Sequence, residues 1–142
     1  MNRIAITLFS ALLIAPVAAI AESMMSEAPA NADVYFVQPT DGATVDQTFK
    51  VVFGLRNMGV APAGVEKAGT GHHHLLIDTD VPSDLSQPLP ATDHVKHFGG
   101  GQTETEVTLA PGKHTLQLLL GNYAHVPHHP PVISEKITVM VK

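Results

Sequence analysis

The chain has 142 residues, with 8 Lys and Arg against 13 Asp and Glu, which gives a formal net charge of -5 at pH 7. It carries no basic stripe, so nucleic acid is not an expected partner. The sequence contains no cysteine, which excludes disulfides, thiolate zinc sites, blue-copper centres with a cysteine ligand and cysteine nucleophiles.

The first 21 residues have the pattern of a secretory signal peptide. Arg3 precedes an apolar run from Ile4 to Ile20, which ends in the small-residue pattern Ala19-Ile20-Ala21. This run is too short, and too closely followed by a cleavage pattern, for a membrane-spanning helix, which needs roughly 20 apolar residues. We therefore expect cleavage after Ala21, a periplasmic or secreted location, and no membrane anchor in the mature protein.

Residues 22–32 are small, polar and unpatterned, and we expect them to form a flexible leader before a single domain at residues 33–142. Short runs of strand-forming residues follow one another along this domain, at residues 33–39, 48–56, 72–78, 103–109, 113–122 and 132–142. The long loop at residues 79–101 has room for one more short, irregular strand. Because no segment has a helical period, the pattern predicts an all-β domain, an immunoglobulin-like antiparallel β-sandwich of about seven strands.

Alternation of apolar and polar residues within these runs indicates which side chains face the core, because alternate residues of a strand share a face. The side chains predicted to face the core are Phe49, Val51, Phe53, Leu55, Leu75, Ile77, Leu116, Leu118, Leu120, Ile133, Ile137, Val139 and Val141.

All nine histidines lie between His72 and His129. In an immunoglobulin-like topology, the segments that carry residues 72–74, 97 and 125–129 approach one rim of the sandwich. His72 and His74 point together from their strand, whereas His73 points to the other side. We therefore predict a metal site at this rim, formed by His72, His74, His97, His125 and His128. The secondary candidates are His73, His114 and His129.

These histidines also have structural interpretations. Residues 72–74 fit a polar strand entry, and residues 125–129 fit an exposed proline-rich loop. His114 begins a strand after a turn, at the rim opposite the predicted site, and is expected to be structural. His94 is expected to be a surface residue.

Several imidazoles without sulfur favour Cu(II) or Zn(II), and we take copper as the expected metal, with zinc as the alternative. The carboxylates of Asp78, Asp80 and Asp93 are candidates to orient an imidazole through a hydrogen bond.

Five segments of the chain carry a family resemblance: GVAPAG, GHHHLLID, HFGGGQTE, LAPGKHTLQLLLG and HVPHHPPVISEKITV. They resemble a bacterial secreted family that is known only as a domain of unknown function, and the resemblance covers nearly everything from Asp33 onward. It implies a small, exported, single-domain protein without an established activity. The histidines at motif positions are His72, His73, His74, His97, His114, His125 and His128.

The leading hypothesis is an exported histidine-rich protein that binds copper for storage, delivery or tolerance, with the metal ion and a periplasmic protein as its partners. The first alternative is a metal-dependent redox enzyme. The second is a metal-free periplasmic interaction module that uses the histidine rim to bind its partner. No serine lies in a nucleophile-elbow pattern. We therefore name no catalytic residue and favour a binding protein over an enzyme.

Overall fold

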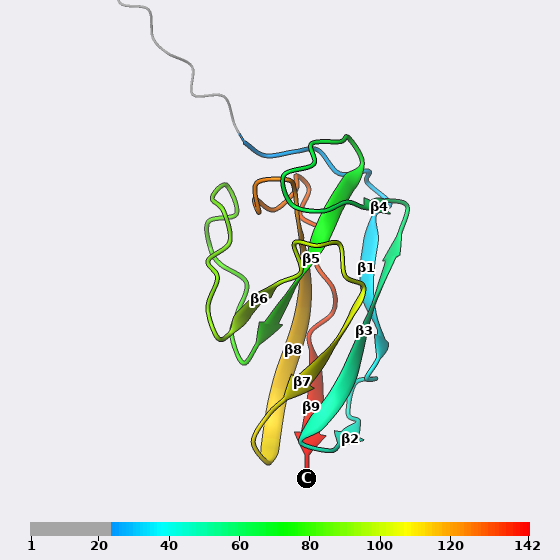
Figure 1. The fold of residues 1–142 in the computed structure, drawn as a ribbon, viewed down its shortest axis with the longest axis vertical. Coiled ribbons are helices and arrows are strands. Elements are labelled where there is room, and N and C mark those ends of the chain that lie inside the picture. The colour runs from blue at the N-terminus through cyan, green and yellow to red at the C-terminus, as the bar shows by residue number, and fades with distance from the viewer. Residues whose placement is uncertain (1–23) are drawn as a thin grey trace, which may run out of the picture.

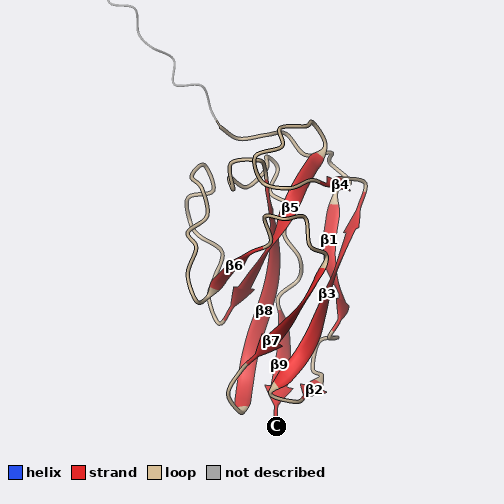
Figure 2. Ribbon diagram, in the orientation of Figure 1, coloured by secondary structure: helices blue, strands red, loops and turns tan. Residues whose placement is uncertain are grey.

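The structure is a computed structural model that describes residues 24–142. The predicted signal peptide, residues 1–21, lies outside the described residues. Within the described range the regular elements are β-strands (Figures 1 and 2), and no helix there is long and apolar enough to span a membrane. The strands are β1 (Asp33–Gln38), β2 (Thr44–Val45), β3 (Thr48–Arg56), β4 (Gly59–Val60), β5 (Thr70–Ile77), β6 (Val95–His97), β7 (Glu104–Thr108), β8 (Gly112–Gly121) and β9 (Ile137–Val141).

The strands form two sheets that pack as a sandwich, which confirms the predicted all-β class (Figure 1). The smaller sheet has the order β1-β3-β7, and the larger sheet has the order β2-β9-β8-β5-β4, with β6 also paired to β5. The expected irregular strand in the long loop is β6. Two details differ from the expected antiparallel sandwich of about seven strands. β2 and β4 are additional strands of two residues each, and both pair in parallel with their neighbours.

The core between the sheets contains the side chains that alternation predicted, with one exception. Ile133 packs instead against a second apolar cluster, and its neighbour Val132 takes the core position. The reason is that β9 begins only at Ile137, so the alternation of that strand does not extend back to residue 133. Ser134 attaches this irregular segment to β8, because its Oγ accepts a hydrogen bond from the backbone N–H of Leu118.

The second apolar cluster covers the outer face of the larger sheet. Leu76 of β5 and Leu119 of β8 are fully buried there against Leu89 and Leu85, which belong to the loop between β5 and β6. Because His72 and His74 share a strand face with Leu76, they also point toward this covered side. The loop therefore buries a face that in many sandwiches is exposed to water.

The N-terminal part of the described chain makes defined contacts with the domain. The backbone N–H of Ala28 donates to the carbonyl of His129, and the N–H of His129 donates to the carbonyl of Ser26. The side-chain amide of Asn122 donates to the Met24 carbonyl and to the Ser26 hydroxyl. Residues 24–28, which belong to the predicted leader, thus lie against the turn that follows β8.

Candidate metal centre

His72 and His74 are held side by side on β5, an interior strand of the larger sheet. β5 pairs along its length with β8, where His72 lies opposite Gly121 and His74 lies opposite Leu119. The two imidazole rings have centroids 4.6 Å apart, and both side chains are fully buried. The predicted pairing of these residues on one face is what the structure shows.

His125 reaches this pair from the turn that follows β8. Its backbone has a φ of 63°, a left-handed conformation that is uncommon for residues other than glycine. Asn122 holds the turn, because its Oδ1 accepts hydrogen bonds from the backbone N–H groups of Ala124 and Val126. Asn122 is not among the residues predicted from the sequence, although an asparagine directly after a strand is a typical turn former.

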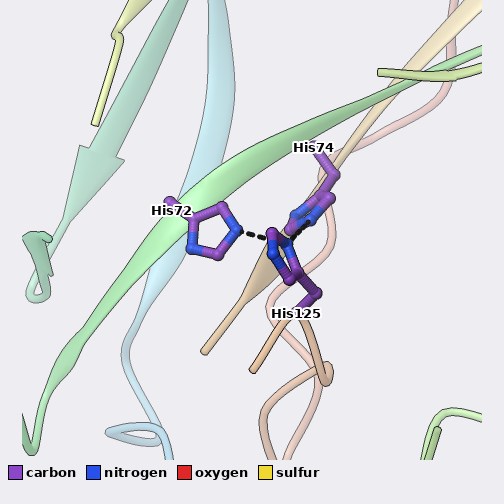
Figure 3. Close-up of side chains that lie close together, drawn as sticks. All are labelled: His72, His74 and His125. Carbon is purple, nitrogen blue, oxygen red and sulfur yellow. Dashed lines mark hydrogen bonds between the residues drawn. The ribbon is translucent and has the colours of Figure 1, made fainter. Parts of the chain in front are cut away.

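Three ring nitrogens converge in this arrangement (Figure 3). The Nε2 atom of His72 lies 2.9 Å from Nδ1 of His125, and Nε2 of His74 lies 3.3 Å from the same atom. All three ligand atoms lie within 4.8 Å of one another. A neutral imidazole nitrogen either donates one hydrogen bond or accepts through one lone pair. Nδ1 of His125 therefore cannot satisfy both partners fully, whereas one cation between the three nitrogens would accept a lone pair from each.

The surroundings keep these rings neutral. Burial, followed by the charge of His125, lowers the pKa of His72 to about 4. Burial, followed by the charge of His72, lowers the pKa of His74 to about 2. Burial and the charge of His97 also lower the pKa of His125. At neutral pH the lone pairs of these imidazoles are therefore available to a metal ion.

Two glycines make room for the histidine rings. A Cβ atom on Gly121 would lie 2.5 Å from Cε1 of His74, and a Cβ on Gly71 would lie 2.7 Å from Cε1 of His128. Neither distance is possible between non-bonded carbon atoms without a shift. Both glycines adjoin histidine motifs in the sequence, but only the packing shows why a side chain is excluded.

His97 lies beside the three converging histidines as a fourth imidazole. It pairs with His74 in the β5–β6 register, and its ring centroid is 4.4 Å from that of His74 and 4.7 Å from that of His125. Its Nε2 donates a hydrogen bond to the carbonyl of Pro90 at 3.0 Å, which leaves the lone pair on Nδ1. The structure therefore places His97 next to the site but outside the group of three.

The structure does not bring His128 or His129 into the group of three. His128 is fully buried, and its Nε2 donates to the carbonyl of Thr70 at 3.0 Å, while its Nδ1 has no hydrogen-bond partner. The side chain of His129 is exposed, and its backbone pairs with residues 26 and 28. The loop 125–129 thus contributes one ligand nitrogen to the group, from His125.

His73 and His114 lie away from the converging nitrogens. His73 faces the core between the sheets, where its ring lies 5.0 Å from that of Phe53 and neither ring nitrogen has a hydrogen-bond partner. His114 lies at the other end of the larger sheet, where its Nδ1 donates to Asp78 at 2.6 Å and its Nε2 donates to the carbonyl of Ala110. The hydrogen bond to Asp78 raises the pKa of His114, as expected of a structural pair.

The three aspartates considered as orienting partners are engaged elsewhere. Asp78 accepts from His114, Asp80 forms an ion pair with Lys136, and Asp93 lies 3.8 Å from Lys96. Among the described residues, the group of ligand atoms that converges contains imidazole nitrogens and no carboxylate.

The fold and the site define an all-β sandwich with a buried histidine cluster that could hold a metal ion. The chain belongs to the family described as Domain of unknown function (DUF4399), which matches residues 51–142. The matched region begins within β3 and contains all nine histidines. No curated protein and no solved structure matches the chain.

Proposed function

We propose that the protein is an exported metal-binding protein that holds copper between His72, His74 and His125, for storage, delivery or tolerance. The observation that carries the proposal is the convergence of three neutral imidazole nitrogens that hydrogen bonds alone cannot satisfy. A buried polar group without a partner costs roughly 1–3 kcal/mol, so a metal ion that accepts all three lone pairs would stabilise the folded state.

The donor set supports copper and sets zinc as the alternative. Imidazole nitrogen suits copper and zinc, whereas calcium and magnesium prefer oxygen ligands. Copper also binds nitrogen sites more tightly than the other divalent metals of its series, zinc included. For a divalent ion, three protein ligands leave a coordination position free, through which the metal could be passed to or from a partner protein.

Export is supported by the sequence pattern of residues 1–21. We propose that the protein works in the periplasm or outside the cell after cleavage behind Ala21. The intact mass and N-terminal sequence of the protein purified from its native host test this directly. A mature chain that begins at Glu22 supports export, and a chain that retains residues 1–21 in the cytoplasm contradicts it.

Metal binding is tested with the mature protein, free of any histidine tag and stripped of metal. We expect one tightly bound equivalent of copper and a rise in melting temperature. A ligand at 100 times its Kd stabilises the folded state by about 2.7 kcal/mol. The His72→Ala/His74→Ala double variant should lose this response.

Two further variants keep the result interpretable. His125→Asn removes a ligand nitrogen but suits the left-handed backbone at this position, so it should fold and still lose binding. His129→Ala removes an exposed histidine outside the group and should bind as the wild type does. The proposal is wrong if the wild type binds no metal, or if His125→Asn and the double variant bind like His129→Ala.

A further inference from the structure

The histidine site is largely buried, and among residues 24–142 no carboxylate converges with its three ring nitrogens. His72 and His74 are fully buried, and Leu119 and Val126, which adjoin the ligands' backbone, are also fully buried. Asp78, which follows β5 directly, is occupied by His114 at the far end of the sheet. The converging group itself consists of neutral imidazoles.

The charged pair beside His97 in the sequence does not change this balance. Lys96 precedes His97 on β6, and its ammonium lies 3.8 Å from the exposed carboxylate of Asp93. This ion pair adds no net charge beside the site. A bound ion would therefore keep its full charge in a partly buried site, since His72 and His74 are buried and His125 is half-buried.

The cost of burying an uncompensated ion grows with the square of its charge, so a divalent ion costs about four times as much as a monovalent ion of similar size. Sites for divalent ions offset this cost with carboxylates or thiolates among their ligands or, where three imidazoles hold zinc, with a bound water whose pKa falls to about 7. Copper is the metal of the proposed function that also has a stable monovalent state.

We infer that the site formed by His72, His74 and His125 selects monovalent copper, Cu(I), over Cu(II) and Zn(II). The inference rests on the proposed function and names the oxidation state of the ion. Cu(I) is satisfied by two or three ligands, which is the number of nitrogens that converge here. His97, whose Nε2 is held by the Pro90 carbonyl, lies outside this group, so the described geometry is three-coordinate.

Selection of Cu(I) differs from the sequence-based expectation of Cu(II) or Zn(II), which rested on several imidazoles without sulfur. The three aspartates that were expected to orient an imidazole each lie beside another cation in the folded protein, so they supply no negative charge to the site. Selectivity for the monovalent ion is thus a consequence of tertiary structure.

His97 provides a matched test, because its ring adjoins those of His74 and His125. His97→Glu places a carboxylate beside the site, and His97→Gln places a neutral group of the same size there. Affinities of the full mature chain for Cu(I), Cu(II) and Zn(II) are measured by competition with chromophoric chelators, with Cu(I) handled anaerobically.

We expect the wild type and His97→Gln to bind Cu(I) at least tenfold more tightly than Cu(II) or Zn(II), because each divalent ion brings one more uncompensated charge into the site. His97→Glu should shift the preference toward the divalent ions by about tenfold or more relative to His97→Gln. Equal or tighter binding of Cu(II) or Zn(II) by the wild type would overturn the inference while leaving the proposed metal-binding function intact. Binding of no ion at all would overturn both.

Discussion

Gly121 leaves the space that the ring of His74 occupies, so the substitution Gly121→Ala tests how the site is built. The added Cβ would lie 2.5 Å from Cε1 and 3.1 Å from Nδ1 of His74. Non-bonded carbon atoms stay about 3.5 Å apart, so the ring must move by about 1 Å. His74 is fully buried on an interior strand, and its Nε2 therefore leaves its position beside His125.

Gly121→Ala should lower both the free energy of unfolding and the affinity for copper. Overpacking a well-packed interior costs about 1–3 kcal/mol, which urea unfolding of the metal-free protein measures. Metal ligands must stay within about 0.2 Å of their ideal distance. Displacing one of three nitrogens by much more than this should weaken copper binding by about 10–100-fold, measured by chelator competition.

Gly54→Ala is the matched control, because Gly54 lies on β3 of the other sheet and an added Cβ would meet the ring of Tyr35 at 2.2 Å. It should reduce stability by a similar amount and leave copper affinity unchanged. The reasoning is refuted if Gly121→Ala binds copper within about twofold of the wild type, or if Gly54→Ala loses as much affinity as Gly121→Ala.

Three further predictions concern neighbouring residues. Asn122→Ala removes the buried side chain that holds the turn of His125, so it should lower the free energy of unfolding by about 2 kcal/mol and weaken copper binding; unchanged binding would contradict this role. His73→Leu replaces a buried imidazole that packs on Phe53 with an apolar side chain of similar size, so it should raise stability by about 1–3 kcal/mol at unchanged copper affinity; lower stability or weaker copper binding would contradict this expectation. Proton competition at two imidazoles with a pKa of 6.5 would weaken binding about 14-fold between pH 7.5 and 6.0. Burial lowers the pKa of His72 to about 4 and that of His74 to about 2, so protons at these two rings should weaken copper affinity by less than about twofold over this range. The measurement uses His129→Ala, which lacks the exposed imidazole outside the group of three, and a tenfold loss of copper affinity would contradict the prediction.

The fold was largely predictable because the longer strands alternate cleanly. The run at residues 48–56 coincides with β3, and its apolar face lies in the core. β2 and β4 were not predictable, since two residues are too few to show a period. The prediction that Ile133 faces the core was wrong for a related reason, because the chain before β9 is irregular and has no fixed alternation.

The histidine site was predictable only in part. Strand alternation alone indicated that His72 and His74 share a face, and the assumed topology brought His125 toward them. The burial of the site depends on the loop between β5 and β6, whose Leu85 and Leu89 pack on the outer face of the sheet. The sequence carried a signal for this, since two leucines in a loop rich in proline and serine require an apolar partner.

The roles of the remaining histidines depend on contacts between distant segments. The carbonyl of Pro90 accepts from His97, and the carbonyl of Thr70 accepts from His128. Neither partner is indicated by local sequence, because any residue offers a backbone carbonyl. The sequence therefore could not separate the three converging nitrogens from the two imidazoles beside them.

X-ray absorption spectroscopy of the copper-loaded mature protein tests the central claim most directly. We predict a first shell of nitrogen at about 2.0 Å, with the outer-shell scattering of three imidazoles and no sulfur. The His125→Asn variant should lose this spectrum, and His129→Ala should keep it. A first shell that contains sulfur, outer-shell scattering from fewer than three imidazoles, or a spectrum that His125→Asn leaves unchanged would contradict copper binding between His72, His74 and His125.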